Sequence, residues 1–565
     1  MAPLDYIVMA VYCVSILASG VIFSRTGANM KSFFAADGEA PWWLSGLSLY
    51  MSFFSAGAFV VWGGMAYEHG VVALNIQWTT SLCGFAVAIF LAHRWKRTGV
   101  MTVGEFIRHR LGTGAQQFYT YAYTFFGVFT AGGLLYPVSK MVSVTSGLPL
   151  PLCCAVLGAV ITIYTAVGGL WAVLVTDTLQ FVVLMAALLI AAPLALREAG
   201  GIESLVAGAP QGYFHLVHGP YNWLFVCAYA LYHLYMLGGK WPYVQRYTSV
   251  PDERSARKVA ALFGVLYIFN PVLFFLPAML YRTVNPHLTG LQVEDAFILM
   301  ARKILPTGLV GLMLAAMLSS SASAANTMLN MLSAVFTRDI YQNRIRRDAS
   351  ERALMIVARL STCVFGALMI SVALIVPLVG GLVEMILSLA AITGGATLLP
   401  PIWALCSKRI SSSAAIAASA IALGVCLFLK LLGPPLLGLK LNRAAEMTVG
   451  VGIPTVVLIV FELVLLARGM VSPGVARFEA HRAALRPGSG ASSAQSRFGA
   501  TVVAYSILFI GTCLLLLGWL APHSQRLVLA VAALVLAVGA LAVWLIRRSQ
   551  AAPKFRHQYP GPQQN

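Results

Sequence analysis

The sequence predicts an all-α polytopic membrane protein, and its composition, the spacing of its apolar runs and the placement of its basic residues all support this fold class. Of its 565 residues, 59% are hydrophobic and 10% are charged, and the mean hydropathy is +0.82. A soluble fold cannot hide so much apolar surface from water. Most of the chain must therefore lie in lipid, where a helix satisfies its own backbone hydrogen bonds.

Apolar runs long enough to cross a bilayer recur from Asp5 to Ile546. The hydrocarbon core needs about 20 residues per helix, and fifteen such runs are separated by short polar joints. The predicted spans cover residues 5–24, 42–66, 71–92, 118–143, 149–167, 172–196, 221–239, 259–281, 307–336, 353–378, 380–406, 412–432, 446–467, 500–521 and 527–546.

The basic residues orient these spans. Of the 38 Lys and Arg, 28 fall in joints of one parity, seven in the other joints and three within spans. The positive-inside rule then places the N-terminus outside and the C-terminus in the cytoplasm. The membrane expected is the cell (inner) membrane. Topology thus explains the net charge of +19, and no nucleic-acid partner is expected. Without a basic segment before it, the first run is predicted to remain as an anchor.

Several segments, in matching order along the chain, resemble one known family of membrane proteins. The family's signature is similar to the stretch from Tyr164 to Ala172, which continues to Asp177 and Gln180. Residues 311–341 resemble the eighth core helix of the family and its exit loop. Two further matches are Pro41-Trp42-Trp43 with Trp78, and Val244-Gln245-Arg246-Tyr247, which resembles the loop after the sixth core helix. Together these segments resemble the sodium:solute symporter family, which includes the sodium/glucose cotransporters.

The resemblance implies a LeuT-type fold, with a ten-helix core of two inverted five-helix repeats, residues 42–196 and 221–406. One extra transmembrane helix precedes this core and about four follow it. The domains expected are an N-terminal helix and loop (1–41), the transport core (42–406), additional helices (407–468), a flexible cytoplasmic loop (469–499), a helical hairpin (500–546) and a cytoplasmic tail (547–565). Inverted repeats place a binding site near the bilayer midplane, between broken helices.

Sodium is a hard cation that is held by oxygen atoms, and free carbonyls arise within a membrane only where a helix unwinds inside protein. Residues 52–57 suit such a break. The resemblance implies sodium ligands at the carbonyls of Met51, Phe54 and Ser320 and at the hydroxyl of Ser323. The next position in the family carries a second hydroxyl, but here it is Ala324, whose methyl group cannot bind an ion.

A second ion site found in some family members offers a compensation. Ser323, Asn326 and Thr327 share one helical face, and Asp177 lies at a similar depth. Two alternatives stay open: the small polar residues are packing contacts between helices, and Asp177 is an interfacial carboxylate that reaches the cytoplasm.

The solute site implied by the resemblance is more apolar than the pocket of the sugar carriers, so a glucose-type ligand is not expected to bind in the usual way. The substrate-binding residues expected are Phe53, Ser55, Gln77, Thr80, His233 and Tyr267. His233 precedes Gly238-Gly239, where the sixth core helix should break. Its neutral ring can donate to and accept from a solute; the alternative is a buried histidine bonded to a backbone carbonyl or a tyrosine.

The expected function is secondary active import of a small organic solute by sodium-coupled symport through alternating access. Proton coupling through Asp177, His233 or Glu384 is the alternative, followed by a transporter-derived solute sensor. Glu384 and Glu462 lie inside apolar runs, where such acids are proton relays or partners of Lys430 or of a backbone donor. An enzyme is not expected, because the ten His are dispersed and form no His-Glu-x-x-His motif.

Overall fold

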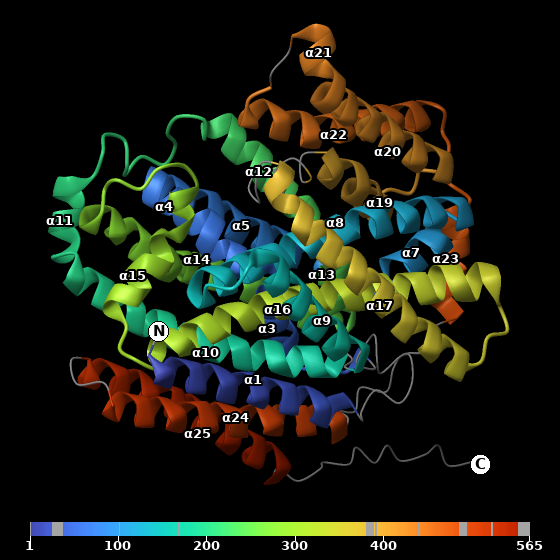
Figure 1. Ribbon diagram of the computed structural model, residues 1–565. Coiled ribbons are helices and arrows are strands. Elements are labelled where there is room, and N and C mark those ends of the chain that lie inside the picture. Colours follow the sequence, from blue (N-terminus) through green and yellow to red (C-terminus); the bar gives the residue numbers. More distant parts are fainter. Residues whose placement is uncertain are drawn as a thin grey trace, which may run out of the picture. The chain divides into compact units, whose positions relative to one another are not determined.

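The computed structural model describes residues 2–24, 38–100, 102–167, 170–379, 389, 392–438, 441–484, 494–520 and 524–551. Helices make up nearly all of this part of the chain (Figure 1). The contacts divide the chain into two units, residues 1–491 and 492–565.

The first unit carries the long helices that build the site. Its helices are α1 (Pro3–Ser24), α3 (Trp42–Phe53), η2 (Ala58–Trp62), α4 (Gly63–His69), α5 (Val71–Phe90), α6 (Ala92–Arg97), α7 (Val103–Arg110), α8 (Thr113–Ser146), α9 (Leu150–Val167), α10 (Leu170–Glu198), α11 (Gly201–Gly208), α12 (Trp223–Gly239), α13 (Trp241–Thr248) and α14 (Glu253–Val284). They continue with η3 (Gly290–Asp295), α15 (Ala296–Ile304), α16 (Leu309–Val335), η4 (Phe336–Ile345), α17 (Glu351–Ile375), η5 (Val376–Val379), η6 (Gly394–Leu398), α19 (Leu399–Cys406), α20 (Ser412–Leu427), η7 (Phe428–Leu432), α21 (Gly433–Leu437), α22 (Arg443–Ala467) and α23 (Gly474–Ala484). The second unit is a pair of packed helices, α24 (Ala494–Trp519) and α25 (Gln525–Ala551).

The helices confirm a multi-pass membrane protein. Among the described residues, ten helices are long and apolar enough to cross a membrane, and the bent pair Trp42–Phe53 and Ala58–His69 makes an eleventh if it is counted as one span. Each of the predicted ranges overlaps a described helix. The count of fifteen spans, the domain boundaries and the orientation stay predictions.

The predicted break in the first core helix is present. The helix α3 ends at Phe53, Phe54 is extended (φ −89°, ψ 136°), and the chain bends by 63° before it resumes at Ala58. The Ala56 N–H, which no longer has a helical acceptor, donates to the Ser321 hydroxyl of α16 at 2.5 Å. A side chain of α16 therefore stabilises the unwound segment.

The sixth core helix also breaks where the sequence predicts it. The helix α12 ends at Gly239, Lys240 is extended (ψ 126°), and α13 begins at Trp241. A Cβ on Gly239 would lie 2.7 Å from the Ile402 side chain and 3.0 Å from the Leu398 carbonyl oxygen, so close packing requires glycine there. The segment after the break, expected to be a loop, is helical instead.

The helix α16 lies at the centre of the first unit, packed against α1, α3, α8, α10 and α17 (Figure 1). The buried Asp5 of α1 caps it: Oδ1 accepts from the N–H groups of Gly308 at 2.7 Å and Gly311 at 3.0 Å. A carboxylate is favourable at a helix N-terminus, where free N–H groups and the helix dipole meet. The cap explains why an acid can be buried at the start of the first span.

Candidate ion and solute sites

Three helices meet at the carboxylate of Asp177 on α10. The hydroxyl of Ser323 on α16 donates to Oδ1, and that of Ser48 on α3 donates to Oδ2 at 2.5 Å. Asp177 is 0% exposed. The alternative that it reaches the cytoplasm is therefore wrong: α3 and α16 cover it completely.

Arg246 on α13 completes this cluster. Its Nη2 lies 3.9 Å from Oδ2 of Asp177, its Nε donates to the Ser48 hydroxyl at 3.1 Å, and its Nη2 donates to the Ser52 hydroxyl at 3.1 Å. Arg246 is also 0% exposed. Arg246 lies in the polar joint between the predicted spans 221–239 and 259–281, yet its side chain is not solvated, because α13 packs against α3 and carries it inward.

The predicted second ion site shares the Asp177 carboxylate. Asn326 and Thr327 are buried on α16, and within the described structure the Thr327 hydroxyl has no hydrogen-bond partner. A buried hydroxyl that is left unpaired is costly, and an ion is one group that can satisfy it. Ser323 meets Asp177 where α10 packs on α16, and Asn326 and Thr327 follow three and four residues later, on the helical face that Ser323 shares.

The predicted first ion site lies at the end of α3. Met51 and Phe54 are buried there, and the last carbonyls of a helix have no intrahelical donor. Ser320 directs its hydroxyl to the Met317 carbonyl of its own helix at 2.9 Å, and it lies inside the uninterrupted helix α16, so the predicted role of its carbonyl stays a prediction. Ala324 is buried and adds no oxygen, so this site has one hydroxyl fewer than its relatives are expected to have.

A cavity of about 270 Å³ opens beside the break in α3. Five of the predicted solute residues line it: Phe53, Ser55, Gln77, His233 and Tyr267. Thr80 does not, which corrects the sixth prediction. It lies about one turn beyond Gln77 on α5, where the surrounding helices leave it fully buried.

His233 both bonds to a backbone carbonyl and lines the cavity, so both alternatives considered for it apply. Its Nδ1 lies 3.2 Å from the Tyr229 carbonyl oxygen and its ring packs edge-on against the Tyr229 ring at 4.3 Å, yet it also lines the cavity 5.5 Å from the Phe53 ring. A carbonyl only accepts, so Nδ1 carries the proton and Nε2 of the neutral ring is left as an acceptor.

Sequence reasoning missed Lys240, which lines the same cavity. It is the first residue of the polar joint between the predicted spans 221–239 and 259–281, and it occupies the break between α12 and α13, with Nζ 5.3 Å from the centre of the Tyr243 ring. The available signal was its position directly after Gly238-Gly239, where a break was predicted.

Of the other acids predicted within spans, Glu462 is described by the structure and has partners. Glu462 accepts hydrogen bonds from Ser407 at 2.7 Å and from Trp403 at 3.1 Å, and pairs with Arg409 at 3.2 Å. Lys430 pairs with Glu446 at 2.7 Å, so the suggested pairing of Lys430 with Glu462 is wrong. Glu384 lies outside the described residues.

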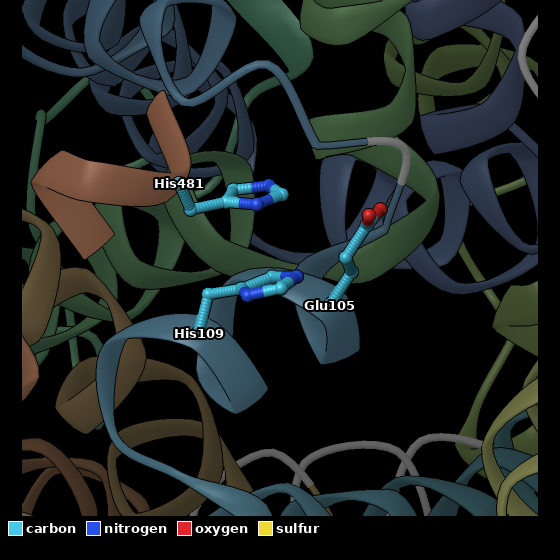
Figure 2. Close-up of side chains that lie close together, drawn as sticks. All are labelled: Glu105, His109 and His481. Carbon is cyan, nitrogen blue, oxygen red and sulfur yellow. The ribbon is translucent and has the colours of Figure 1, made fainter. Parts of the chain in front are cut away.

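A second cluster lies away from the cavity, where α23 packs on α7. Figure 2 shows Glu105 and His109 of α7 beside His481 of α23. The two imidazole rings stack with centroids 3.7 Å apart and planes at 10°. Lone pairs lie in the ring plane, so stacked rings direct them in parallel rather than toward one point. We therefore interpret the stack as a docking contact. The helix α23 itself lies in the stretch predicted to be a flexible loop.

Comparison with known families decides the family. The family model described as the sodium:solute symporter family matches residues 33–422. The chain belongs to the sodium:solute symporter family. Two relatives from Mus musculus are each 26% identical: Solute carrier family 5 member 4B, over 66% of this chain and 63% of its own length, and Sodium/glucose cotransporter 1, over 63% and 60%. The chain thus spans less than two thirds of the curated relatives it matches.

A solved structure shares the fold of this symporter-family chain. The structure, described as the substrate-bound outward-open state of a Na⁺-coupled sialic acid symporter, aligns with a TM-score of 0.71 at 19% identity and covers 82% of this chain and 98% of its own. The predicted LeuT-type fold class is confirmed. The broken helices α3 and α12 are the features that this fold places around a binding site.

Proposed function

We propose that the protein is a secondary active transporter that imports a small organic solute by sodium-coupled symport through alternating access. The observation that carries this proposal is that Ser52, at the end of α3, belongs to both sites. Its hydroxyl accepts from Arg246 in the Asp177 cluster, and Ser52 also lines the solute cavity. An ion that changes this cluster changes a wall of the cavity.

Coupling follows from this shared element. A sodium ion held by the Asp177 carboxylate and the hydroxyls of Ser323 and Thr327 competes with Arg246 for the same negative charge. Its binding shifts Arg246 and its hydrogen bond to Ser52, and so favours one arrangement of α3. A ligand drives a conformational transition only if its affinity differs between the outward-open and inward-open states. Solute and ion each supply such a difference, because they contact opposite faces of α3.

The membrane orientation belongs to the same proposal. With the N-terminus outside, the strongly basic joints face the cytoplasm, and the chain resides in a cell (inner) membrane. The family supports a small organic solute, and the mostly apolar and aromatic lining of the cavity supports a solute with an apolar body.

Sodium binding can be tested before any solute is known. The purified protein is unfolded thermally in NaCl and in KCl at equal ionic strength. We expect sodium alone to raise the melting temperature, because sodium at ten times its Kd adds about 1.4 kcal/mol to the free energy of unfolding. Asp177→Asn and Thr327→Ala should each remove most of this shift.

The matched control is Thr362→Ala on α17, where the Thr362 hydroxyl donates to the Ala358 carbonyl of its own helix. This variant should keep the sodium shift. If the melting temperature ignores sodium but depends on pH through Asp177 or His233, the proposal of sodium coupling fails and proton coupling replaces it.

A further inference from the structure

The solute cavity is lined by a partly buried cation, and the described part of its lining holds no anion. Lys240 lines it, and none of the other described lining residues is Asp or Glu. The nearest recorded partner of its ammonium group is the face of the Tyr243 ring, at 5.3 Å. A ring face attracts a cation weakly, whereas a cation removed from water needs a counter-charge.

The surroundings of Lys240 are fixed and mostly aromatic. Trp241, the next residue, stacks on Tyr123 with ring centroids 4.5 Å apart and planes at 7°. The break between α12 and α13 gives Lys240 an extended backbone, and the close packing of Gly239 holds this break in place. The ammonium group is therefore presented to the cavity by ordered structure.

We propose that Lys240 binds the anionic group of the solute, so that the transported class is small organic carboxylates with an apolar or aromatic body. This inference rests on the proposed transport function and narrows its substrate. One carboxylate balances the single positive charge, whereas a phosphate dianion would leave negative charge unpaired in an apolar cavity. His233 and Gln77 supply neutral hydrogen-bonding groups, and the aromatic lining packs against the rest of the solute.

The experiment compares solutes of equal size that differ in charge. The purified full-length protein in NaCl is titrated with benzoate and benzamide, with phenylacetate and phenylacetamide, and with pentanoate and pentanamide, while thermal unfolding is recorded. We expect each carboxylate that binds to bind about tenfold or more tightly than its amide, since hydrogen bonds to charged groups are the stronger ones.

Three variants assign the effect to Lys240. Lys240→Gln should weaken carboxylate binding about tenfold or more and leave amide binding nearly unchanged, and Lys240→Arg should retain the preference. Lys303→Gln removes an exposed lysine outside the cavity and should behave as the wild type. The sodium shift measured without solute should persist in Lys240→Gln, because Lys240 makes no recorded contact with the Asp177 cluster.

The results that overturn the proposal are distinct from those that overturn sodium coupling. The proposal fails if the wild type, while still stabilised by sodium, binds no carboxylate or binds the amides equally well. It also fails if Lys240→Gln binds carboxylates as the wild type does. The proposal fails, too, if adding Glu384→Gln restores a melting temperature that Lys240→Gln lowers, because Lys240 then balances a carboxylate of the chain itself. The comparison of carboxylate with amide needs no variant, so it remains decisive if Lys240→Gln does not fold.

Discussion

Asp177 and Arg246 form a fully buried ion pair whose strength is open to measurement. The atoms Nη2 and Oδ2 lie 3.9 Å apart, which corresponds to an attraction of about 4 kcal/mol at an effective dielectric constant of about 20. Asp177→Asn or Arg246→Gln leaves the other charge buried and unpaired. We expect each single variant to lower the free energy of unfolding by about 3–5 kcal/mol.

A double-mutant cycle isolates the interaction. Unfolding in sodium dodecyl sulfate, followed by tryptophan fluorescence, gives the free energies of the wild type, the two single variants and the double variant. The double variant buries neither charge, so its loss should fall short of the sum of the single losses by about 2 kcal/mol or more. Additivity within about 0.5 kcal/mol would refute the reasoning.

An exposed pair provides the control. Lys303 and Glu198 lie only 2.9 Å apart, but their side chains are 48% and 38% exposed. Solvent screens such a pair, and its coupling should stay below about 1 kcal/mol. If distance rather than burial set the coupling, the Lys303–Glu198 pair would give the larger value.

The variants of the buried pair also report on the ion. Arg246→Gln leaves Asp177 unbalanced and should enlarge the rise in melting temperature that sodium causes, which a purely structural pair would not do.

Two further predictions concern packing and pH. Gly311→Ala should destabilise the protein by about 1–3 kcal/mol in the same assay, because its Cβ would overlap the Asp5 backbone; Gly452→Ala, where a Cβ meets nothing within 4 Å, should be near neutral, and equal effects would refute the packing argument. Burial, with the neighbouring His481, holds the pKa of His109 below its usual value. The docked state thus favours the neutral ring, so docking of α23 on α7 is complete above about pH 6.5 and weakens as the pH falls below it. Hydrogen exchange of residues 474–484, corrected for intrinsic rates, should rise between pH 7.5 and 5.5, and the absence of any change would contradict this.

Much of the fold follows from local sequence. Apolar runs of bilayer length predict helices because lipid leaves the backbone no other partners. The breaks are also readable: residues 52–57 and Gly238-Gly239 interrupt apolar runs with small residues, and both interruptions occur in the structure. Five of six predicted solute residues line the cavity; the family resemblance supplied these positions, which lie on four different helices or at the break after α3.

The partners of the charged residues could not be predicted from the sequence. Charge alone indicates water, so the sequence predicts that Lys240 and Arg246, which fall between the spans 221–239 and 259–281, are solvated. Instead, α13 carries Arg246 to a carboxylate 69 positions earlier in the chain. Likewise, nothing in the sequence predicts that His481 stacks on His109, because the contact joins a short helix to a segment that reads as a flexible loop.

The sequence by itself determined the membrane environment, the helical class, the family resemblance and the two helix breaks, because each depends on hydropathy and residue type along a continuous stretch. Only the tertiary structure decided that Asp177 shares its charge with Arg246, that Thr80 lies outside the cavity and that Lys240 faces it. These facts depend on which helix faces meet, and long-range packing fixes that across segments far apart in the chain.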